Sequence, residues 1–342
     1  MIIPKNILIV RNDSIGDVVL SLPLAGLIKK HYPDCKITFL LRNYTKDIAI
    51  DHPNIDDVII LKEDNGKIPV WKNVNQLKKG SFDASIIVYP TFITALIIFL
   101  ARVKFRVGSG YRWYSFLFNK KVFEHRKYSE KHELEYNVNL LKVFGIEESI
   151  STKNVPFDLR INKTSMEKVN KTLTDSGFEF EKKTIIVHPG SGGSAIDLPI
   201  EKFSQLVKNL SLLNELNIII TGNEDEKNIC KTISANTNAI DLSSKFNLSE
   251  IICLISLSDI FISNSTGPIH IAAALGKYTV GFYPKIRACS PERWGPFTEK
   301  KVIFTPELEC NDCSREQCER LNCMNSIDID SVTKEITKLI SI

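Results

Sequence analysis

The chain has 342 residues, 43% of them hydrophobic and 25% charged, a composition typical of a globular protein with room for two hydrophobic cores. Its longest apolar run, Phe92 to Ala101, is about half as long as a membrane-spanning helix, so we expect no transmembrane segment. Arg11 and Asp13 interrupt the apolar N-terminus too early for a secretory signal peptide. We therefore expect a cytoplasmic protein.

Short apolar segments alternate with amphipathic segments along the first half of the chain. Such alternation predicts a parallel sheet whose strands are joined by crossover helices. The expected strands are residues 6–10, 37–41, 58–61 and 84–88, and the expected helices are residues 17–31, with a start or kink at Pro23, and residues 131–144.

A polar stretch from 146 to 182 interrupts this alternation, which then resumes. The expected strands of the second half are residues 184–188, 217–221, 239–242, 259–263 and 278–282, and the expected helices are 199–213, 224–234, 248–256 and 268–275. Two such runs indicate an α/β protein with two Rossmann-like domains facing a central cleft. The expected boundaries are an N-terminal domain at 1–160, a linker region at 161–182 and a C-terminal domain at 183–330, followed by a last helix at 331–342.

The segment after the first strand, Arg11 to Leu20, lacks the Gly-x-Gly-x-x-Gly spacing of a dinucleotide site, which disfavours a hydride-transfer enzyme. It places Asp17 where a loop enters a helix, with Arg11 and Asp13 nearby. One interpretation of Asp17 is a residue that caps the helix. The other is a general base that takes a proton from a substrate hydroxyl in a cleft.

Two segments of the second half have the composition of anion-binding loops. Residues 188–195, after the first strand, contain three glycines and two serines, which let the backbone approach a ligand and direct N–H and hydroxyl groups at it. Residues 261–276 read as a strand, a tight turn and a helix that starts near Pro268, and a helix N-terminus attracts anions. A flexible loop and an ordinary strand-to-helix connection are the simpler alternatives. Together the two segments favour a diphosphate held between them.

The net charge is only +4, but the charges are distributed unevenly. Between Arg102 and Lys131 nine basic residues stand against two acidic ones, which leaves a local excess of seven positive charges. This stretch is either a solvated surface or a docking surface for an anionic partner, whether phosphorylated lipid, membrane or nucleic acid. The preceding run, Phe92 to Ala101, is either a buried crossover helix or a shallow membrane contact.

Half of the eight cysteines lie within fourteen residues, at Cys310, Cys313, Cys318 and Cys323. In a cytoplasmic protein this cluster indicates either a structural metal site, with zinc as the metal, or reduced or paired structural thiols. Asp328 and Asp330 imitate a metal-binding Asp-x-Asp pair, but they precede the last helix and capping explains them better.

Four motifs follow one another along the chain: Ile15-Gly16-Asp17, His188-Pro189-Gly190-Ser191, Ser263 to His270, and Arg293-Trp294-Gly295-Pro296. In this combination the chain resembles the heptosyltransferase family of glycosyltransferases, which build the inner core of bacterial lipopolysaccharide from ADP-heptose. The resemblance implies the GT-B fold and an inverting, metal-independent transfer of a sugar, heptose from ADP-heptose, to a lipopolysaccharide core or related glycan. It implies no cofactor for catalysis and no nucleic acid partner. The implied partners are a nucleotide-diphosphate sugar and a lipid-linked oligosaccharide acceptor, met through peripheral contact with the inner membrane face.

The resemblance also implies roles for individual residues. Asp17 would be the catalytic base, and Arg11, Arg287 and Arg293 are the candidates for stabilising charge. Phe246 would contact the nucleotide base, although a core aromatic residue explains it equally well. The other residues around the nucleotide sugar would be Ser191, Gly192, Gly222, Glu226, Ser265, Thr266, Gly267 and His270. From the basic stretch, the candidates for the acceptor and membrane side are Arg112, Lys120, Lys121, Arg126 and Lys127. The helix at 331–342 would pack back on the N-terminal domain.

Two positions depart from the family pattern. The family places a Lys or Arg shortly after the His-Pro-Gly-Ser loop, where this chain has Ile196, and Ser265 stands where many relatives carry Asp. Both departures bear on the identity of the donor. Two other classes of function stay open on the residues alone: a nucleotide-sugar epimerase or hydrolase with the same fold, and a non-catalytic protein that binds anionic lipid.

Overall fold

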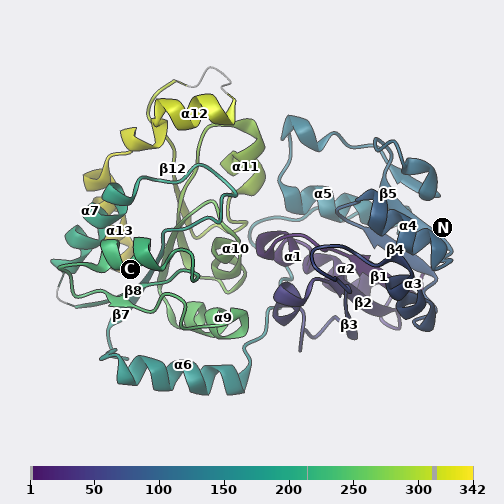
Figure 1. Cartoon of the computed structure of the whole chain (residues 1–342), viewed down its shortest axis with the longest axis horizontal. Helices are drawn as coiled ribbons and strands as arrows, with labels where there is room; N and C mark the ends of the chain where they lie inside the picture. Colours follow the sequence, from purple (N-terminus) through teal and green to yellow (C-terminus); the bar gives the residue numbers. More distant parts are fainter. Residues whose placement is uncertain (1–2, 214, 310–313, 342) are drawn as a thin grey trace. The chain divides into compact units, whose positions relative to one another are not determined.

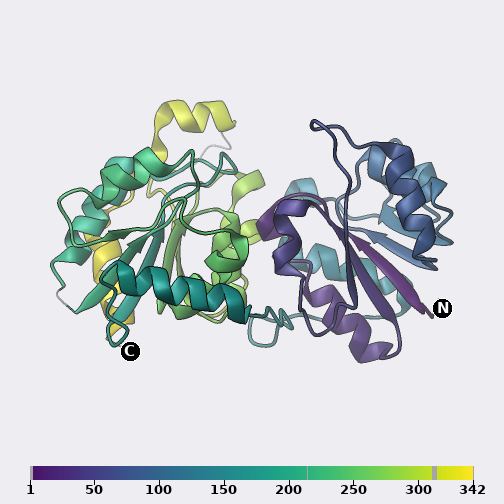
Figure 2. The same cartoon turned by 60° about the horizontal axis from the view of Figure 1, so that its bottom comes forward.

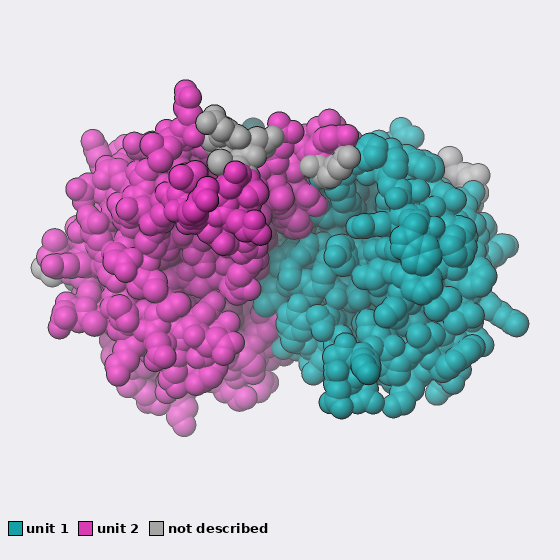
Figure 3. Space-filling view, turned by 45° about the horizontal axis from the view of Figure 1, so that its top comes forward, with its two compact units in different colours: residues 1–126, 133–160 teal, residues 127–132, 161–342 magenta. Residues whose placement is uncertain are grey.

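The computed structural model describes residues 3–213, 215–309 and 314–341. The chain divides into two compact units, which Figure 3 shows in two colours. Unit 1 contains residues 1–126 and 133–160, and unit 2 contains residues 127–132 and 161–342. Each unit is described separately below.

Unit 1 is built around a parallel six-stranded sheet with the strand order β3-β2-β1-β4-β5-β6 (Figure 1). Its elements in chain order are β1 (Asn6–Val10), α1 (Ile15–Val19), α2 (Pro23–His31), β2 (Lys36–Leu41), η1 (Asn43–Ile48), β3 (Asp57–Ile60), α3 (Val70–Lys79), β4 (Ala84–Ile87), α4 (Phe92–Leu100), β5 (Phe105–Ser109), η2 (Ser115–Leu117), β6 (Lys120–Val122), α5 (Glu133–Asn139) and η4 (Leu140–Phe144). The short 3-10 turn η3 (Arg126–Tyr128) begins in unit 1 and ends in unit 2.

The sheet of unit 1 is covered on both faces, as parallel sheets with crossover helices are. Leu8 and Val10 of β1 point into an apolar core that residues of α3 and α4 complete. Successive strand residues point to opposite faces, so Ile7 and Ile9, which are equally buried, face the other layer of helices. This alternation explains why β1 reads as a continuous apolar run.

Unit 2 repeats this architecture with a parallel six-stranded sheet in the order β12-β11-β10-β7-β8-β9, and Figure 2 shows helices on both faces of each sheet. Its elements are α6 (Lys163–Asp175), β7 (Lys183–His188), α7 (Ile200–Ser211), β8 (Leu216–Ile220), α8 (Lys227–Ser234), β9 (Ile240–Asp241), α9 (Leu248–Leu257), β10 (Ile260–Asn264), α10 (Gly267–Ala274), β11 (Tyr278–Phe282), η5 (Arg287–Cys289), α11 (Pro291–Trp294), β12 (Lys301–Phe304), α12 (Arg315–Leu321), η6 (Cys323–Ser326) and α13 (Ile329–Ile340).

The two sheets share one topology. Numbered within its own unit, each sheet has the strand order 3-2-1-4-5-6. Strands are added first on one side of the first strand and then on the other. The order therefore reverses between β1 and β4 in unit 1 and between β7 and β10 in unit 2. In sheets of this kind, ligands bind outside the carboxyl ends of the strands at the switch point. The topology thus predicts where each unit carries its site.

Each strand expected from the sequence overlaps a strand of the structure, whereas two expected helices are interrupted. The helix expected at 17–31 is two helices, and Pro23 occupies the first turn of the second, where a missing N–H costs nothing. The helix expected at 131–144 is α5 followed by the 3-10 turn η4, and Gly145 ends it with a φ of 78°. The elements that the sequence analysis did not identify include α3, β5, β6 and β12.

The structure differs from the expected domain boundaries in two places. The region expected to be a linker contains α6, which packs on α9 through buried Leu173 and a 2.8 Å hydrogen bond between the hydroxyls of Ser165 and Ser249. The last helix, α13, was expected to pack on the N-terminal domain. Instead, Val332 and Ile336 of α13 enter the apolar core of unit 2 beside α7.

None of the helices within the described ranges has the length and apolar character needed to cross a membrane. The apolar run Phe92 to Ala101 forms α4, which has two kinds of surface. Ala95, Ile97 and Ile98 are buried in the core of unit 1, as a crossover helix requires. Phe92 and its neighbour Ile93 are exposed.

Candidate functional site

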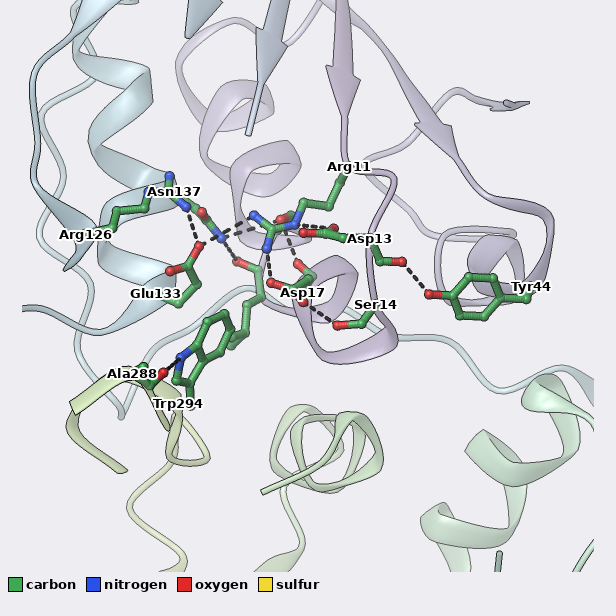
Figure 4. A network of polar contacts seen from close by, with 12 residues as sticks. Arg11, Asp13, Ser14, Asp17, Tyr44, Arg126, Glu133, Asn137, Ala288 and Trp294 are labelled. Atoms are coloured by element: carbon green, nitrogen blue, oxygen red, sulfur yellow. Dashed lines mark hydrogen bonds and ion pairs between the residues drawn. The ribbon is translucent and has the colours of Figure 1, made fainter. Parts of the chain in front are cut away.

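In unit 1 the candidate site lies directly after β1, at the switch point of the sheet (Figure 4). Its centre is Arg11, a fully buried side chain that contacts three carboxylates. Arg11 Nε lies 2.8 Å from Asp13 Oδ1, Nη2 pairs with Asp17 Oδ1, and Nη1 lies 3.6 Å from Glu133 Oε1. Burying a guanidinium without such partners costs free energy, so the three carboxylates stabilise Arg11 in the folded protein. Arg11 in turn fixes the positions of these carboxylates.

Asp17 is the third residue of α1, and its carboxylate is held by side chains. Oδ1 accepts a hydrogen bond from Arg11 and Oδ2 accepts one from the hydroxyl of Ser14. Ser14 is the N-cap residue, but its side chain makes no capping bond to the helix backbone. The Asp17 side chain keeps 14% of its surface exposed. The Asp17 carboxylate is therefore oriented by Arg11 and Ser14 and is open to solvent on one side.

Glu133 connects this cluster to a second cation. It opens α5, is buried, and pairs with Arg126 as well as with Arg11. The sequence analysis placed Arg126 among the candidates for the acceptor and membrane side and gave Glu133 no role. In the ion pairs found among the described residues, the two guanidiniums of Arg11 and Arg126 meet three carboxylates. A proton on one carboxylate would reduce the repulsion between these acids.

Asp13 is the carboxylate that the surroundings favour for this proton. Burial raises the pKa of the Asp13 carboxyl to about 7, an effect that Arg11 opposes and the neighbouring charge of Asp17 increases. The main-chain carbonyl of Asp13 accepts a 2.5 Å hydrogen bond from the hydroxyl of Tyr44, which fixes the loop. The sequence analysis placed Asp13 near Asp17 but did not identify it as a titrating neighbour.

We expect Asp13→Asn to change how stability depends on pH. The folded pKa of Asp13 lies above the ordinary value near 4, so between about pH 4 and 7 the folded protein keeps a proton that the unfolded chain has released. The stabilisation from this group is complete below about pH 4 and is lost as the pH rises to about 7. Urea unfolding between pH 5 and pH 8 should show a smaller loss of stability in the variant than in the parent protein. Equal losses in both, with Asp57→Asn as the control on an exposed residue, would contradict this assignment.

In unit 2 the two loops that the sequence analysis singled out lie side by side, because the strands that precede them, β7 and β10, are neighbours. Ser194 joins the loops: its hydroxyl donates to Ser191 O at 2.9 Å and to Ser265 O at 2.8 Å. Asn264 adds a second link, since its Nδ2 donates to Pro189 O at 2.6 Å. Hydrogen bonds therefore connect the two loops to each other at the carboxyl end of the sheet.

Glu226 fills the space beside the first loop. A Cβ on Gly190 would lie 1.7 Å from Glu226 Oε1, so only glycine allows this approach. Glu226 Oε2 accepts a 2.8 Å hydrogen bond from the N–H of Asn223, one residue after Gly222. Nearby, the Nδ1 atom of His188 lies 3.0 Å from Thr221 Oγ1, and burial lowers the pKa of this His. The residues after β8 are thus brought to the loop that follows β7.

The remaining candidates for the nucleotide sugar lie along the same edge. Thr266 is the N-cap of α10, Gly267 begins the helix, and His270 is buried in its first turn. Phe246 is half-buried in the turn between β9 and α9. Ser191 and Gly192 belong to the first loop, where Gly192 and Gly193 have the positive φ angles of 58° and 76° that suit an anion-binding turn.

The sequence analysis named two cations in unit 2 as candidates, and the structure adds a third. Ile196 is buried in the apolar core of unit 2 and offers no charge. Arg287 is exposed in η5, and the Arg293 guanidinium lies 4.9 Å from the centre of the Trp294 ring. The sequence analysis missed Arg315 of α12, whose Nη2 donates to Gly193 O at 2.9 Å and to Ala195 O at 3.2 Å. Arg315 therefore brings a positive charge to the glycine-rich loop.

The basic residues proposed for the acceptor side have different surroundings. Arg112 is exposed. On the edge strand β6, Lys121 is exposed and Lys120 is half-buried. Arg126 is paired with Glu133, so it belongs to the buried cluster. Lys127 lies in η3, and its side chain is outside the described part of the structure.

The cysteine cluster is only partly covered. Cys310 and Cys313 lie outside the described residues, whereas Cys318 is buried in α12 and Cys323 is half-buried at the start of η6. Among the residues that the structure does describe, no group of three or more His, Cys, Asp or Glu side chains is arranged to hold a metal ion. The zinc site suggested by the spacing stays a prediction.

Two Rossmann-like units, each with its polar residues gathered at the switch point of its sheet, give this chain the GT-B fold. The model of glycosyltransferase family 9 (heptosyltransferase) matches residues 70–324. The chain belongs to this family.

Sequence relatives agree with this assignment. A protein of Haemophilus influenzae, whose name says only that it is a presumed glycosyltransferase, is 30% identical over 309 residues, covering 88% of this chain and 89% of its own. The lipopolysaccharide core heptosyltransferase OpsX of the same organism is 25% identical, covering 82% of this chain and 79% of its own.

Solved structures show the same fold. A glycosyl transferase family 9 protein from Veillonella parvula has a TM-score of 0.83 at 19% identity and covers 98% of this chain and 97% of its own. The E. coli ADP-heptose lipopolysaccharide heptosyltransferase II has a TM-score of 0.77 at 18% identity and covers 98% of both chains.

Proposed function

We propose that this protein is an inverting, metal-independent heptosyltransferase that transfers heptose from ADP-heptose to a lipopolysaccharide core or related glycan. The observation that carries the proposal is the carboxylate of Asp17, which Arg11 and Ser14 hold at the switch point of unit 1 with one side open to solvent. The names of the relatives support the substrates: one is a lipopolysaccharide core heptosyltransferase and another an ADP-heptose enzyme.

In the proposed reaction, Asp17 takes the proton of an acceptor hydroxyl while that oxygen attacks the anomeric carbon of the donor sugar. The new glycosidic bond forms as the bond from the anomeric carbon to the diphosphate oxygen breaks, and the electron pair leaves with the nucleoside diphosphate. Attack from the opposite face inverts the anomeric configuration. An anchored carboxylate within reach of the hydroxyl is what general-base catalysis requires.

Unit 2 would hold the donor. The N-terminus of α10 and the glycine-rich loop present N–H groups and hydroxyls where a diphosphate leaves, and Arg315 adds a positive charge to that loop. Glu226 would bond the ribose, and Phe246 would contact the base. Arg287 and Arg293 are further candidates for charge stabilisation on the η5–α11 segment.

The acceptor of such an enzyme is lipid-linked and phosphorylated, so we place the reaction at the cytoplasmic face of the inner membrane. The exposed cations Arg112 and Lys121, with half-buried Lys120, would attract the acceptor's phosphate groups. We propose no role for nucleic acid.

The test is incubation of the whole chain with ADP-heptose and a heptose-free lipopolysaccharide acceptor, with and without EDTA. Because N–H groups and arginines are proposed to meet the charge of the leaving diphosphate, turnover should survive chelation. Mass spectrometry should show one added heptose per acceptor, and the stereochemistry of the product should be inverted. If ADP-heptose were consumed at the same rate with and without the acceptor, the protein would instead be a hydrolase or an epimerase. Turnover that EDTA abolishes and magnesium restores, in protein that stays folded, would contradict the metal-independent mechanism.

A further inference from the structure

One segment of unit 1 combines positive charge with a complete lack of acidic residues. The forty residues from 84 to 123 contain no Asp or Glu. Their basic residues are Arg102, Lys104, Arg106, Arg112, Lys120 and Lys121. A solvated surface ordinarily mixes both signs of charge, so this segment presents a field of one sign.

The same segment exposes an unusual amount of apolar surface. Of the eighteen large hydrophobic side chains that are exposed among the described residues, eight come from these forty. Trp113 is 74% exposed, Phe116 66% and Phe123 62%. The other five are Tyr89, Phe92, Ile93, Phe99 and Tyr111. Single exposed apolar residues are ordinary, whereas exposed apolar side chains that contact one another mark an interaction surface.

These exposed rings are anchored to the folded core. The rings of Phe92 and Trp113 are stacked with their centres 5.0 Å apart, and Trp113 also meets the edge of Tyr114 at 5.4 Å. Tyr114 is buried in the core, and its hydroxyl donates to Pro90 O at 2.5 Å.

A second pair of rings, Tyr111 and Phe123, lies edge to face at 5.5 Å and joins the connection that follows β5 to the residue after β6. We call the six side chains Phe92, Ile93, Tyr111, Trp113, Phe116 and Phe123 the aromatic face. Its anchored members are held by ring contacts and by the core, so little conformational freedom is left to lose on binding.

We propose that the aromatic face is the surface through which this enzyme enters the headgroup region of an anionic bilayer. The proposal rests on the proposed function, because it concerns the membrane in which a lipid-linked acceptor is anchored. Tryptophan and tyrosine favour the boundary between water and hydrocarbon, and the phenylalanines and Ile93 have no polar atoms to desolvate. Arg112, between Tyr111 and Trp113 in the sequence, supplies charge for lipid phosphates.

The charge of the segment also argues against a second copy of the chain as the occupant. A dimer formed through this face would bring two acid-free, basic segments together, and like charges without counter-charges oppose association. An anionic lipid surface supplies the missing negative charge. Arg126 pairs with Glu133, so we assign the membrane contact to the basic residues that precede it in the chain.

The test is sedimentation of the whole chain with vesicles of phosphatidylglycerol and phosphatidylethanolamine, compared with vesicles of phosphatidylcholine. The parent protein should bind the anionic vesicles, and binding should weaken as salt is added. The double variant Trp113→Ser/Phe116→Ser should reduce the partition coefficient about tenfold or more, because the two most exposed rings are removed. Both residues lie on the surface, so the variant should stay folded, and losing the contacts of Trp113 with Phe92 and Tyr114 should lower the melting temperature only slightly.

The matched control is Phe180→Ser/Leu212→Ser, which removes two exposed apolar side chains of unit 2 and should leave vesicle binding unchanged. Transfer to a lipid-embedded acceptor should fall in the Trp113/Phe116 variant, whereas transfer to a deacylated, water-soluble acceptor should not. If the parent protein transferred heptose to neither acceptor, the proposed function would be refuted. The vesicle-binding measurement would still test the aromatic face by itself. Unaltered vesicle binding in the variant would overturn the proposal, and so would a parent dimer that the variant converts to a monomer.

Discussion

Asp17→Asn is expected to lower turnover by about a hundredfold or more while the fold and donor binding stay intact, which is the usual effect of losing a general base. The amide is nearly isosteric and still accepts a hydrogen bond from Arg11 or Ser14, but it takes no proton at neutral pH. Steady-state kinetics should show the loss in kcat, with little change in KM for ADP-heptose, because the proposed donor residues belong to unit 2.

The control for this experiment is Asp57→Asn, which changes an exposed acid at the start of β3 and should leave turnover unchanged. Thermal shifts with ADP should be the same for parent, Asp17→Asn and control, since a ligand that binds only the folded state raises the melting temperature equally in all three. A folded Asp17→Asn protein with parental kcat would remove this residue from the mechanism.

Arg11→Met is expected to cause the largest loss of stability among single substitutions at the site, about 3 to 5 kcal/mol. The guanidinium is buried and is the shared partner of Asp13, Asp17 and Glu133. Its removal takes away the cation that Asp13, Asp17 and Glu133 share. Urea unfolding at pH 7 measures the loss, and turnover should fall with it because Asp17 keeps only the hydrogen bond from Ser14 of the two that orient it.

Two comparisons separate this effect from an ordinary loss of a surface ion pair. Arg42→Met removes the cation of the partly exposed Arg42–Glu63 pair, 2.9 Å apart, and should cost no more than about 1 kcal/mol. Arg11 opposes the rise that burial causes in the pKa of Asp13, so without Arg11 this pKa should lie further above its unfolded value and stability should fall as the pH increases. The penalty of Arg11→Met should therefore be smaller at pH 5 than at pH 8. A penalty that is independent of pH would indicate a packing defect.

The positions of the candidate loops could be predicted because the information is local. Apolar runs end at Val10, His188 and Asn264, and the residues that follow are the glycines, serines and acids of loops. Parallel strands place all such ends at one edge of a sheet, so neighbouring strands bring their loops together. The contact of Ser194 with Ser265 O follows from this rule and from little else.

The partners of these loops could not be predicted, because they come from distant parts of the chain. Glu133 lies more than a hundred residues after Arg11, and the sequence around it gives no sign that it faces a buried cation. Arg315 reaches the glycine-rich loop from a helix that follows the cysteine cluster. Strand β6 has only three residues, two of them lysines, so no apolar pattern announces it.

The assignment of residues 127–132 to unit 2 has a consequence for dividing this protein into parts. The chain passes between the units three times, after residues 126, 132 and 160. His132 from this short segment is buried in unit 2 with Nε2 2.7 Å from Gly295 O, and the flanking residues Arg126 and Glu133 are paired within unit 1. If the chain were divided after residue 160, the C-terminal fragment would lack His132. The N-terminal fragment would contain His132 without the unit 2 residues that bury it. Neither half should therefore be expected to fold well by itself, and crystallography or NMR should use the whole chain.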